Sequence, residues 1–175
     1  ALDVLGKMFK LGVALLMKRG FTTALSDTDL PKGAKDAIWN VFGRAEHDVA
    51  ELISLYNSGQ LDMLPGRTLR ETLELKILEV LNKARDETGK IVAMNVESYS
   101  HTIVMAISGA RGTPLNLAQM AGCVGQQALR GKRIEMGYAG RTLSSFKRDD
   151  LTPEARGFIK NSFKSGLKPA EFFFQ

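Results

Sequence analysis

The sequence of 175 residues is poor in the side chains that build disulfides and metal sites. Its one cysteine, Cys123, permits no intrachain disulfide and excludes a four-cysteine zinc site. Cys123 stands among small residues, which is typical of a buried packing position. The two histidines, His47 and His101, lie far apart in the sequence without a partner motif, so we expect no metal or acid–base site at either.

Long apolar runs are missing as well. No stretch approaches the roughly 18 consecutive apolar residues of a membrane span. Lys7, Lys10 and Lys18 interrupt the apolar N-terminal segment, which therefore does not resemble a signal peptide. We expect a cytoplasmic protein without a membrane partner.

Motifs for phosphate binding and catalysis do not occur either. Gly131-Lys132 is followed by Arg133, where a Walker-type loop requires serine or threonine. There is no Gly-x-Ser-x-Gly elbow and no cluster of aspartates that could hold magnesium ions. We therefore expect no catalytic residue, metal or cofactor in this chain alone.

The charged side chains are present in quantity but are distributed unevenly. Residues 1–128 contain 14 basic and 14 acidic side chains, whereas residues 129–175 contain 10 basic and 5 acidic ones, so the net charge of +5 comes from the C-terminal segment. A basic segment of this kind suits a surface that meets phosphates. A solvated surface without a partner is the alternative that charge alone leaves open.

A helical hairpin is the clearest structural prediction. Residues 34–57 carry apolar side chains at alternating spacings of four and three, a heptad pattern that indicates packing along another helix. Thr68 and Glu71 form a capping box at the start of a second apolar helix, residues 68–88, which we expect Gly89 to end. An ordinary two-helix corner of a globular core is the alternative. The apolar positions of the first helix are Ile38, Phe42, Ala45, Val49, Leu52 and Tyr56.

The sequence as a whole predicts a mainly α fold: an antiparallel helical hairpin plus a small helical domain with short β-strands and loops around residues 133–147. Residues 91–108 are compatible with strand or buried helix, and Thr152-Pro153 predicts a helix to about residue 165. Because the chain opens on an apolar helix and stops after three phenylalanines, we interpret it as a piece of a larger protein. We divide it into residues 1–33, 34–89, 90–150 and 151–175.

A glycine-rich stretch, residues 109–141, is the most distinctive part of the sequence. Gly109 and Gly112 allow a tight loop that holds Arg111 outward. Thr113-Pro114 then suits a helix start, and we expect this helix to end at Gln126-Gln127. Its small residues lie on one face, so another segment is expected to approach it closely. They are Ala118, Ala121, Gly122 and Gly125.

This stretch resembles the largest subunit of multisubunit DNA-directed RNA polymerases, in its archaeal and eukaryotic form. The resemblance includes the loop at residues 109–112 and continues into the C-terminal segment. The first half of the chain is similar to the same subunit more loosely. The residues that carry the resemblance are CVGQQ at 123–127, GKRI at 131–134, GRTL at 140–143, TPEARGF at 152–158 and PAEFFF at 169–174, with GFTTAL, LPGRTLRETLE and KARDETG earlier.

The resemblance implies the funnel and pore region of that subunit. In this family the hairpin forms the funnel at the outer mouth of the secondary channel, and residues 169–175 begin the bridge helix. Nucleoside triphosphates (NTPs) enter through the channel, backtracked RNA leaves through it, and a transcript cleavage factor docks there. The expected partners are the other polymerase subunits, the rest of the largest subunit, NTPs and the RNA 3′ end. The resemblance favours helix for residues 102–107 and an archaeal source.

The resemblance also implies site residues. Arg111 matches a basic position of the family's glycine loop, so it is expected to contact nucleotide or RNA phosphates, with a structural ion pair as the alternative. Gln126, Gln127, Lys132 and Arg133 match positions that line the secondary channel, and a structural hydrogen-bonding role is equally open for them. The resemblance implies that the whole enzyme is a nucleotidyltransferase. In the family the catalytic magnesium ion is bound upstream of this region, so this chain alone is expected to be inactive. The rival interpretation is a free-standing helical interaction protein with a basic nucleic-acid-binding tail.

Overall fold

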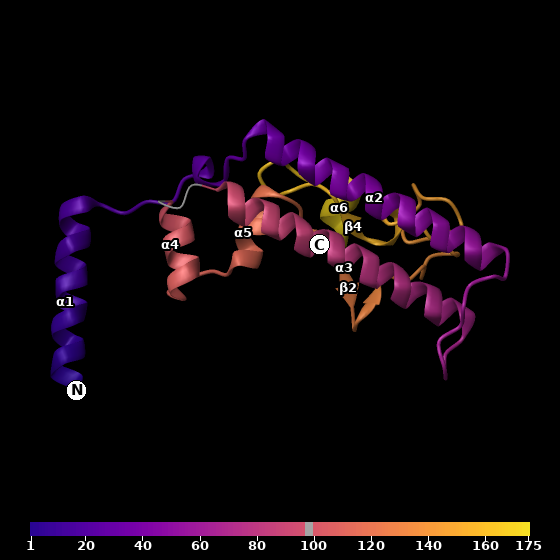
Figure 1. Ribbon diagram of the computed structural model, residues 1–175, viewed down its shortest axis with the longest axis horizontal. Coiled ribbons are helices and arrows are strands. Elements are labelled where there is room, and N and C mark those ends of the chain that lie inside the picture. Colours follow the sequence, from indigo (N-terminus) through magenta and orange to yellow (C-terminus); the bar gives the residue numbers. More distant parts are fainter. Residues whose placement is uncertain (97–99) are drawn as a thin grey trace.

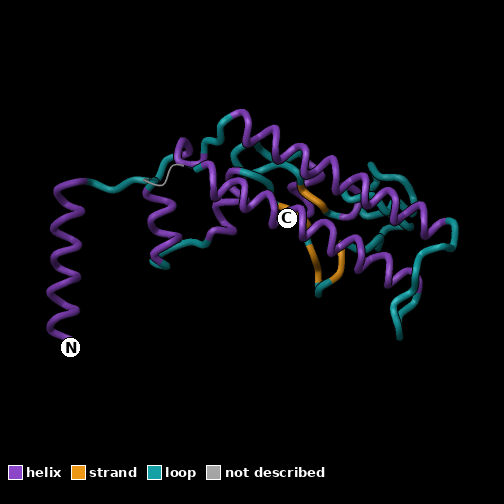
Figure 2. The backbone as a smooth tube through the Cα atoms, in the orientation of Figure 1, coloured by secondary structure: helices purple, strands orange, loops and turns teal. Residues whose placement is uncertain are grey.

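The computed structural model describes residues 1–96 and 100–175, and its fold is mainly α, as predicted. Two long helices, α2 (Lys32–Asn57) and α3 (Leu69–Asn95), lie side by side as an antiparallel hairpin that forms the body of the molecule (Figures 1 and 2). The shorter helices are α1 (Leu2–Arg19), α4 (His101–Ser108), α5 (Pro114–Ala121) and α6 (Pro169–Phe174), with 3₁₀ turns η1 (Leu25–Thr28) and η2 (Glu154–Arg156).

The hairpin is held together by the predicted apolar stripe. On α2, Phe42 and Val49 are 2% and 0% exposed, and on α3 Leu73, Ile77 and Leu81 are each 0% exposed. These side chains belong to one apolar cluster between the two helices. The hairpin prediction is therefore confirmed, and full burial of each such side chain contributes about 1.5–3 kcal/mol to folding.

The second arm begins where the capping box predicts and ends later than expected. The Thr68 backbone N–H donates to Glu71 Oε2 at 2.8 Å, and the Glu71 backbone N–H donates to Thr68 Oγ1 at 3.2 Å. Gly89 was expected to end this helix, but α3 continues to Asn95. A glycine inside a helix costs about 1 kcal/mol relative to alanine. Burial of Thr88 and Val92 on either side of it, at 0% and 1% exposure, offsets that cost.

Helix α5 is shorter than predicted, and its small residues pack against α3. Thr113 caps it through the Asn116 backbone N–H at 3.3 Å, with Pro114 in the first turn as expected. The helix ends at Ala121 and not at Gln126, because Gly122 leaves the helical conformation with φ −102° and ψ −83°. A Cβ at Gly122 would lie 2.7 Å from Thr88 Cγ2, so a close approach occurs there as expected, although side chains of α3 and not its backbone make it.

We expect Gly122→Ala to lower the free energy of unfolding by about 1–3 kcal/mol, because the added methyl group overpacks the contact with α3. The matched control is Gly43→Ala in the middle of α2, where a Cβ would meet no atom within 4 Å. That change should raise stability by about 0.5–1 kcal/mol. Urea denaturation of both variants checks the pair, and equal effects of the two changes would contradict this packing.

The C-terminal segment is not the helix predicted for residues 152–165. One 3₁₀ turn, η2, is followed by Gly157 at φ 89°, and strand β4 (Phe158–Ile159) follows. Phe158 and Ile159 are 1% and 0% exposed, and because neighbouring side chains of a strand point to opposite faces, both faces of β4 are covered. Strand β4 pairs antiparallel with β1 (Gly125–Gln126).

Short antiparallel strands connect the basic segment to the hairpin. Strand β2 (Ala128–Leu129) pairs with β3 (Lys132–Arg133), and Tyr138 pairs with Arg141 in an isolated bridge. Both β1 and β3 contact α3, which lies above β2 in Figure 1. Short strands and loops were predicted around residues 133–147; β2 and β3 lie just before and at the start of that range, and the Tyr138–Arg141 bridge lies within it. The contacts of β1 and β3 with α3 make the hairpin the support of this segment.

Helix α1 stands apart from the rest of the molecule (Figure 1) and has no buried residue. Its apolar side chains are accordingly open, with Leu2 87% and Met17 84% exposed. None of the helices in the described part of the chain is long and apolar enough to cross a membrane.

Candidate functional site

The glycine loop, residues 109–112, presents Arg111 on a defined backbone. Gly109 and Gly112 both have positive φ, 75° and 76°, which side-chain-bearing residues rarely adopt. The Ala110 and Arg111 backbone N–H groups donate to the Met105 carbonyl at 3.1 and 3.3 Å, which folds the loop back on α4. The Arg111 side chain is exposed. The loop therefore holds a cation outward, as its sequence predicts.

Arg111 does not lie beside the other predicted site residues. The loop joins α4 to α5 near one end of the hairpin, whereas β2 and its partner β3 lie further along α3 (Figure 1). Lys132 and Arg133 are thus presented from a second place on the molecule.

The two glutamines are used within the fold. Gln126 is 8% exposed, and its Nε2 donates to the carbonyl oxygens of Gln127 at 2.7 Å and Arg156 at 2.8 Å. The half-buried Gln127 donates its backbone N–H to the Gly157 carbonyl at 2.8 Å. These bonds fix the pairing of β1 with the segment around Gly157, which favours the structural alternative for Gln126.

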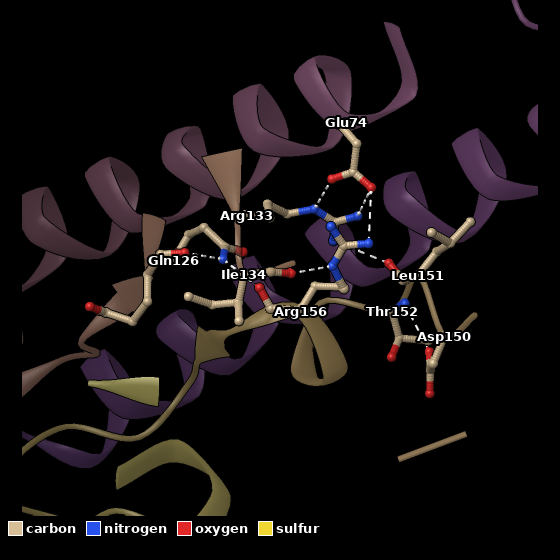
Figure 3. A network of polar contacts seen from close by, with 9 residues as sticks. Glu74, Gln126, Arg133, Ile134, Asp150, Leu151, Thr152 and Arg156 are labelled. Carbon is tan, nitrogen blue, oxygen red and sulfur yellow. Dashed lines mark hydrogen bonds and ion pairs between the residues drawn. The ribbon is translucent and has the colours of Figure 1, made fainter. Parts of the chain in front are cut away.

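Arg133 is the most deeply buried of the predicted site residues, with 0% of its side chain exposed. Its Nε and Nη2 donate to the two carboxylate oxygens of Glu74 at 2.8 and 3.2 Å, and its Nη1 donates to the Leu151 carbonyl at 3.1 Å (Figure 3). A two-pronged pair of this kind joins β3 to α3 and fixes both side chains.

Sequence reasoning missed two members of this network, Glu74 and Arg156. Figure 3 shows both guanidinium groups turned toward the Glu74 carboxylate. Arg156 Nη1 lies 3.3 Å from Glu74 Oε1, and Arg156 Nε donates to the Ile134 carbonyl at 2.6 Å. Burial is the main cause that lowers the pKa of Arg156 from its ordinary value, and the charge of Glu74 opposes the shift. Glu74 lies in LPGRTLRETLE and Arg156 in TPEARGF, two of the motifs that carry the resemblance. Nothing in either motif indicates that the two side chains pair.

Lys132 differs from its neighbour Arg133. Its side chain is exposed and contributes to a cavity of about 400 Å³ between the first half of α3 and the β3 segment. Among the five predicted site residues, Arg111 and Lys132 are therefore the ones whose side chains are exposed.

The cysteine and the histidines show no sign of a metal site. Cys123 is 1% exposed, and burial raises the pKa of its thiol to about 11. His47 and His101 are exposed, and the His101 ring stacks on Phe21 at 4.4 Å. Residues 1–96 and 100–175 contain no group of three His, Cys, Asp or Glu side chains that could hold a metal ion.

These features define a helical hairpin module that supports two basic surfaces, the glycine loop and the β3 segment. Residues 53–159 match the family model described as RNA polymerase Rpb1, domain 4, and the chain belongs to that family. The resemblance to the largest polymerase subunit is confirmed.

The similar proteins carry the name DNA-directed RNA polymerase subunit Rpo1N. The chain is 46% identical over 179 residues to that of Methanothermobacter thermautotrophicus, covering 99% of this chain and 20% of the relative. It is 47% identical over 174 residues to that of Thermococcus celer, covering 99% and 19%. For Halobacterium salinarum the identity is 48% over 170 residues, covering 97% and 18%. The chain thus spans about a fifth of the length of these archaeal relatives.

Proposed function

We propose that this chain forms part of the funnel and secondary-channel wall of a DNA-directed RNA polymerase. The observation that carries the proposal is the 46–48% identity over 97–99% of the chain, which includes the hairpin and the glycine loop together. Identity over so much of the chain favours this function over a free-standing interaction protein with a basic tail.

In this proposal the wall attracts nucleoside triphosphates and RNA through their phosphate groups. A nucleoside triphosphate carries about four negative charges, so a basic wall raises its local concentration and its rate of entry. The net charge of +5, with exposed Arg111 and Lys132, suits that task. In this proposal NTPs enter along the wall, backtracked RNA leaves along it, and a transcript cleavage factor docks on the outer hairpin.

The site residues divide into two roles in this proposal. Arg111 contacts nucleotide or RNA phosphates, and Lys132 and Gln127 line the channel. Gln126 and Arg133 hold the wall in shape through the hydrogen bonds of their buried side chains. The exposed side chains of Arg111 and Lys132 and the buried side chains of Gln126 and Arg133 support this division.

The whole enzyme is proposed to be a cytoplasmic, archaeal nucleotidyltransferase whose magnesium ion is bound outside this chain. The partners are the other polymerase subunits and the rest of the largest subunit, and the open apolar side chains of α1 offer a surface for the latter. The division at residues 33, 89 and 150 remains a proposal. We expect no RNA synthesis from the purified chain with magnesium, and template-dependent synthesis would contradict that expectation.

Photo-cross-linking tests the proposed location. In assembled polymerase, a photoreactive amino acid in place of Ala110 should cross-link to the 3′ segment of RNA in backtracked complexes and much less in complexes that are not backtracked. The control replaces Ser58, which ends α2 far from the glycine loop. Equal cross-linking at the two positions, or none at Ala110, would contradict the proposed path of the RNA.

A further inference from the structure

The cavity between α3 and the β3 segment, here the α3–β3 cavity, has walls of unusual charge. Its volume is about 400 Å³, and its lining includes five cationic side chains and three carboxylates. The cations come from three separate segments: the turn before α3 with the first turn of that helix, strand β3, and η2. The lining therefore carries an excess of two positive charges.

Two of the three carboxylates are already engaged. Glu71 accepts from the Thr68 backbone N–H at 2.8 Å as part of the helix cap, and Glu74 accepts from Arg133 at 2.8 and 3.2 Å. The third, Glu135, is exposed. Glu71 and Glu74 thus serve the cap and the buried pair, whereas Glu135 lines the cavity without either role.

Three cations of the lining are exposed, Arg67, Arg70 and Lys132. None of them belongs to the ion pairs found among the described residues. Arginine offers a planar fork of donors and lysine a compact charge, which together are the usual ligands of phosphate oxygens. The exposed part of the lining therefore offers free donors.

The inner wall adds charge that Glu74 does not balance. Arg133 and Arg156 share this single carboxylate, and the Arg156 side chain is only 6% exposed. Arg156 Nη1 lies 3.3 Å from Glu74 Oε1 as an ion pair, but it makes no hydrogen bond within the described ranges, 1–96 and 100–175. The half-buried Leu75, Leu78 and Met136 also line the cavity, and apolar surroundings strengthen the attraction of the cations for an anion.

We propose that the α3–β3 cavity is a binding site for a phosphate or diphosphate group. Its oxygens accept from Arg67, Arg70 and Lys132, while Arg133 and Arg156 supply a fixed positive field from behind. A phosphate dianion balances the excess of two positive charges in the lining, and a diphosphate more than balances it. A volume of about 400 Å³ leaves room for such a group. The site goes beyond the proposed function, since it lies apart from Arg111.

The test measures protection of the Lys132 amine in the assembled polymerase. Lys132 is acetylated with an amine-reactive ester at increasing concentrations of inorganic pyrophosphate, without magnesium, and its labelling is followed by mass spectrometry. Saturable slowing at Lys132, with no slowing at the exposed control Lys147 outside the cavity, is expected. Arg67→Gln should raise the half-protecting concentration about tenfold or more.

Three results would overturn the proposal. Lys132 could react at the same rate at every pyrophosphate concentration, or Lys132 and Lys147 could be slowed equally, which would mean unspecific screening. Lys132 could also be unreactive in the assembled polymerase without pyrophosphate, which would mean that another polypeptide fills the cavity. Because the readout is local to Lys132, it does not depend on nucleotide addition or on Arg111.

Discussion

Replacing Arg111 by alanine in the assembled polymerase is expected to lower kcat/KM for nucleotide addition about ten- to hundredfold. The loss corresponds to one charge-assisted contact with a phosphate, worth about 1.5–3 kcal/mol. The side chain is exposed on a loop whose backbone is fixed by Gly109 and Gly112. Its truncation should therefore change the free energy of unfolding by less than about 0.5 kcal/mol.

Single-nucleotide extension at several NTP concentrations, with a melting curve for each variant, checks this prediction. Arg111→Lys should recover part of the activity, because the charge remains while the planar fork is lost. Arg148→Ala, at another exposed arginine, is the matched control and should extend normally. An Arg111→Ala enzyme with unchanged kinetics and a lowered melting temperature would show that Arg111 is a structural residue.

The largest effect on stability is expected from Glu74→Ala. This change leaves the buried guanidinium groups of Arg133 and Arg156, 0% and 6% exposed, without their shared carboxylate. Removing one partner from a buried ion pair costs about 3–5 kcal/mol. For a chain of this size the melting temperature should fall by about 6–20 °C.

Thermal unfolding followed by circular dichroism measures that loss. Glu79→Ala on the same helix is the control, because Glu79 is exposed and its removal should stay within about 0.5 kcal/mol. A loss below about 1 kcal/mol for Glu74→Ala would mean that the two arginines do not depend on this carboxylate.

The long elements of the fold could be predicted because their signals are local. The four-and-three spacing from Ile38 to Val49 and the Thr68–Glu71 box lie within single helices, and both were confirmed. The errors occur where tertiary packing overrides a local signal. Gly89 remains helical because α5 packs beside it, and Phe158-Ile159 form a strand because β1 pairs with them.

In the candidate site, too, the features with a local sequence signal could be predicted and those that depend on distant residues could not. The outward Arg111 could be predicted because the glycines that fix its loop are its neighbours in the sequence. The Glu74–Arg133–Arg156 network could not, because Arg133 lies 59 residues from its carboxylate partner. Burial of Arg133 was hidden for the same reason, since a basic residue in a basic segment is ordinarily exposed.

The central claim is that this chain forms part of the wall of the channel through which nucleoside triphosphates enter a polymerase. A cryo-electron microscopy map of the assembled polymerase that contains the chain tests it most directly. We predict that α2 and α3 border the outer mouth of the channel leading to the active site, with the Arg111 side chain open to that channel. A map in which the hairpin lies on a surface remote from the channel, or in which Arg111 is buried against another polypeptide, would contradict the account.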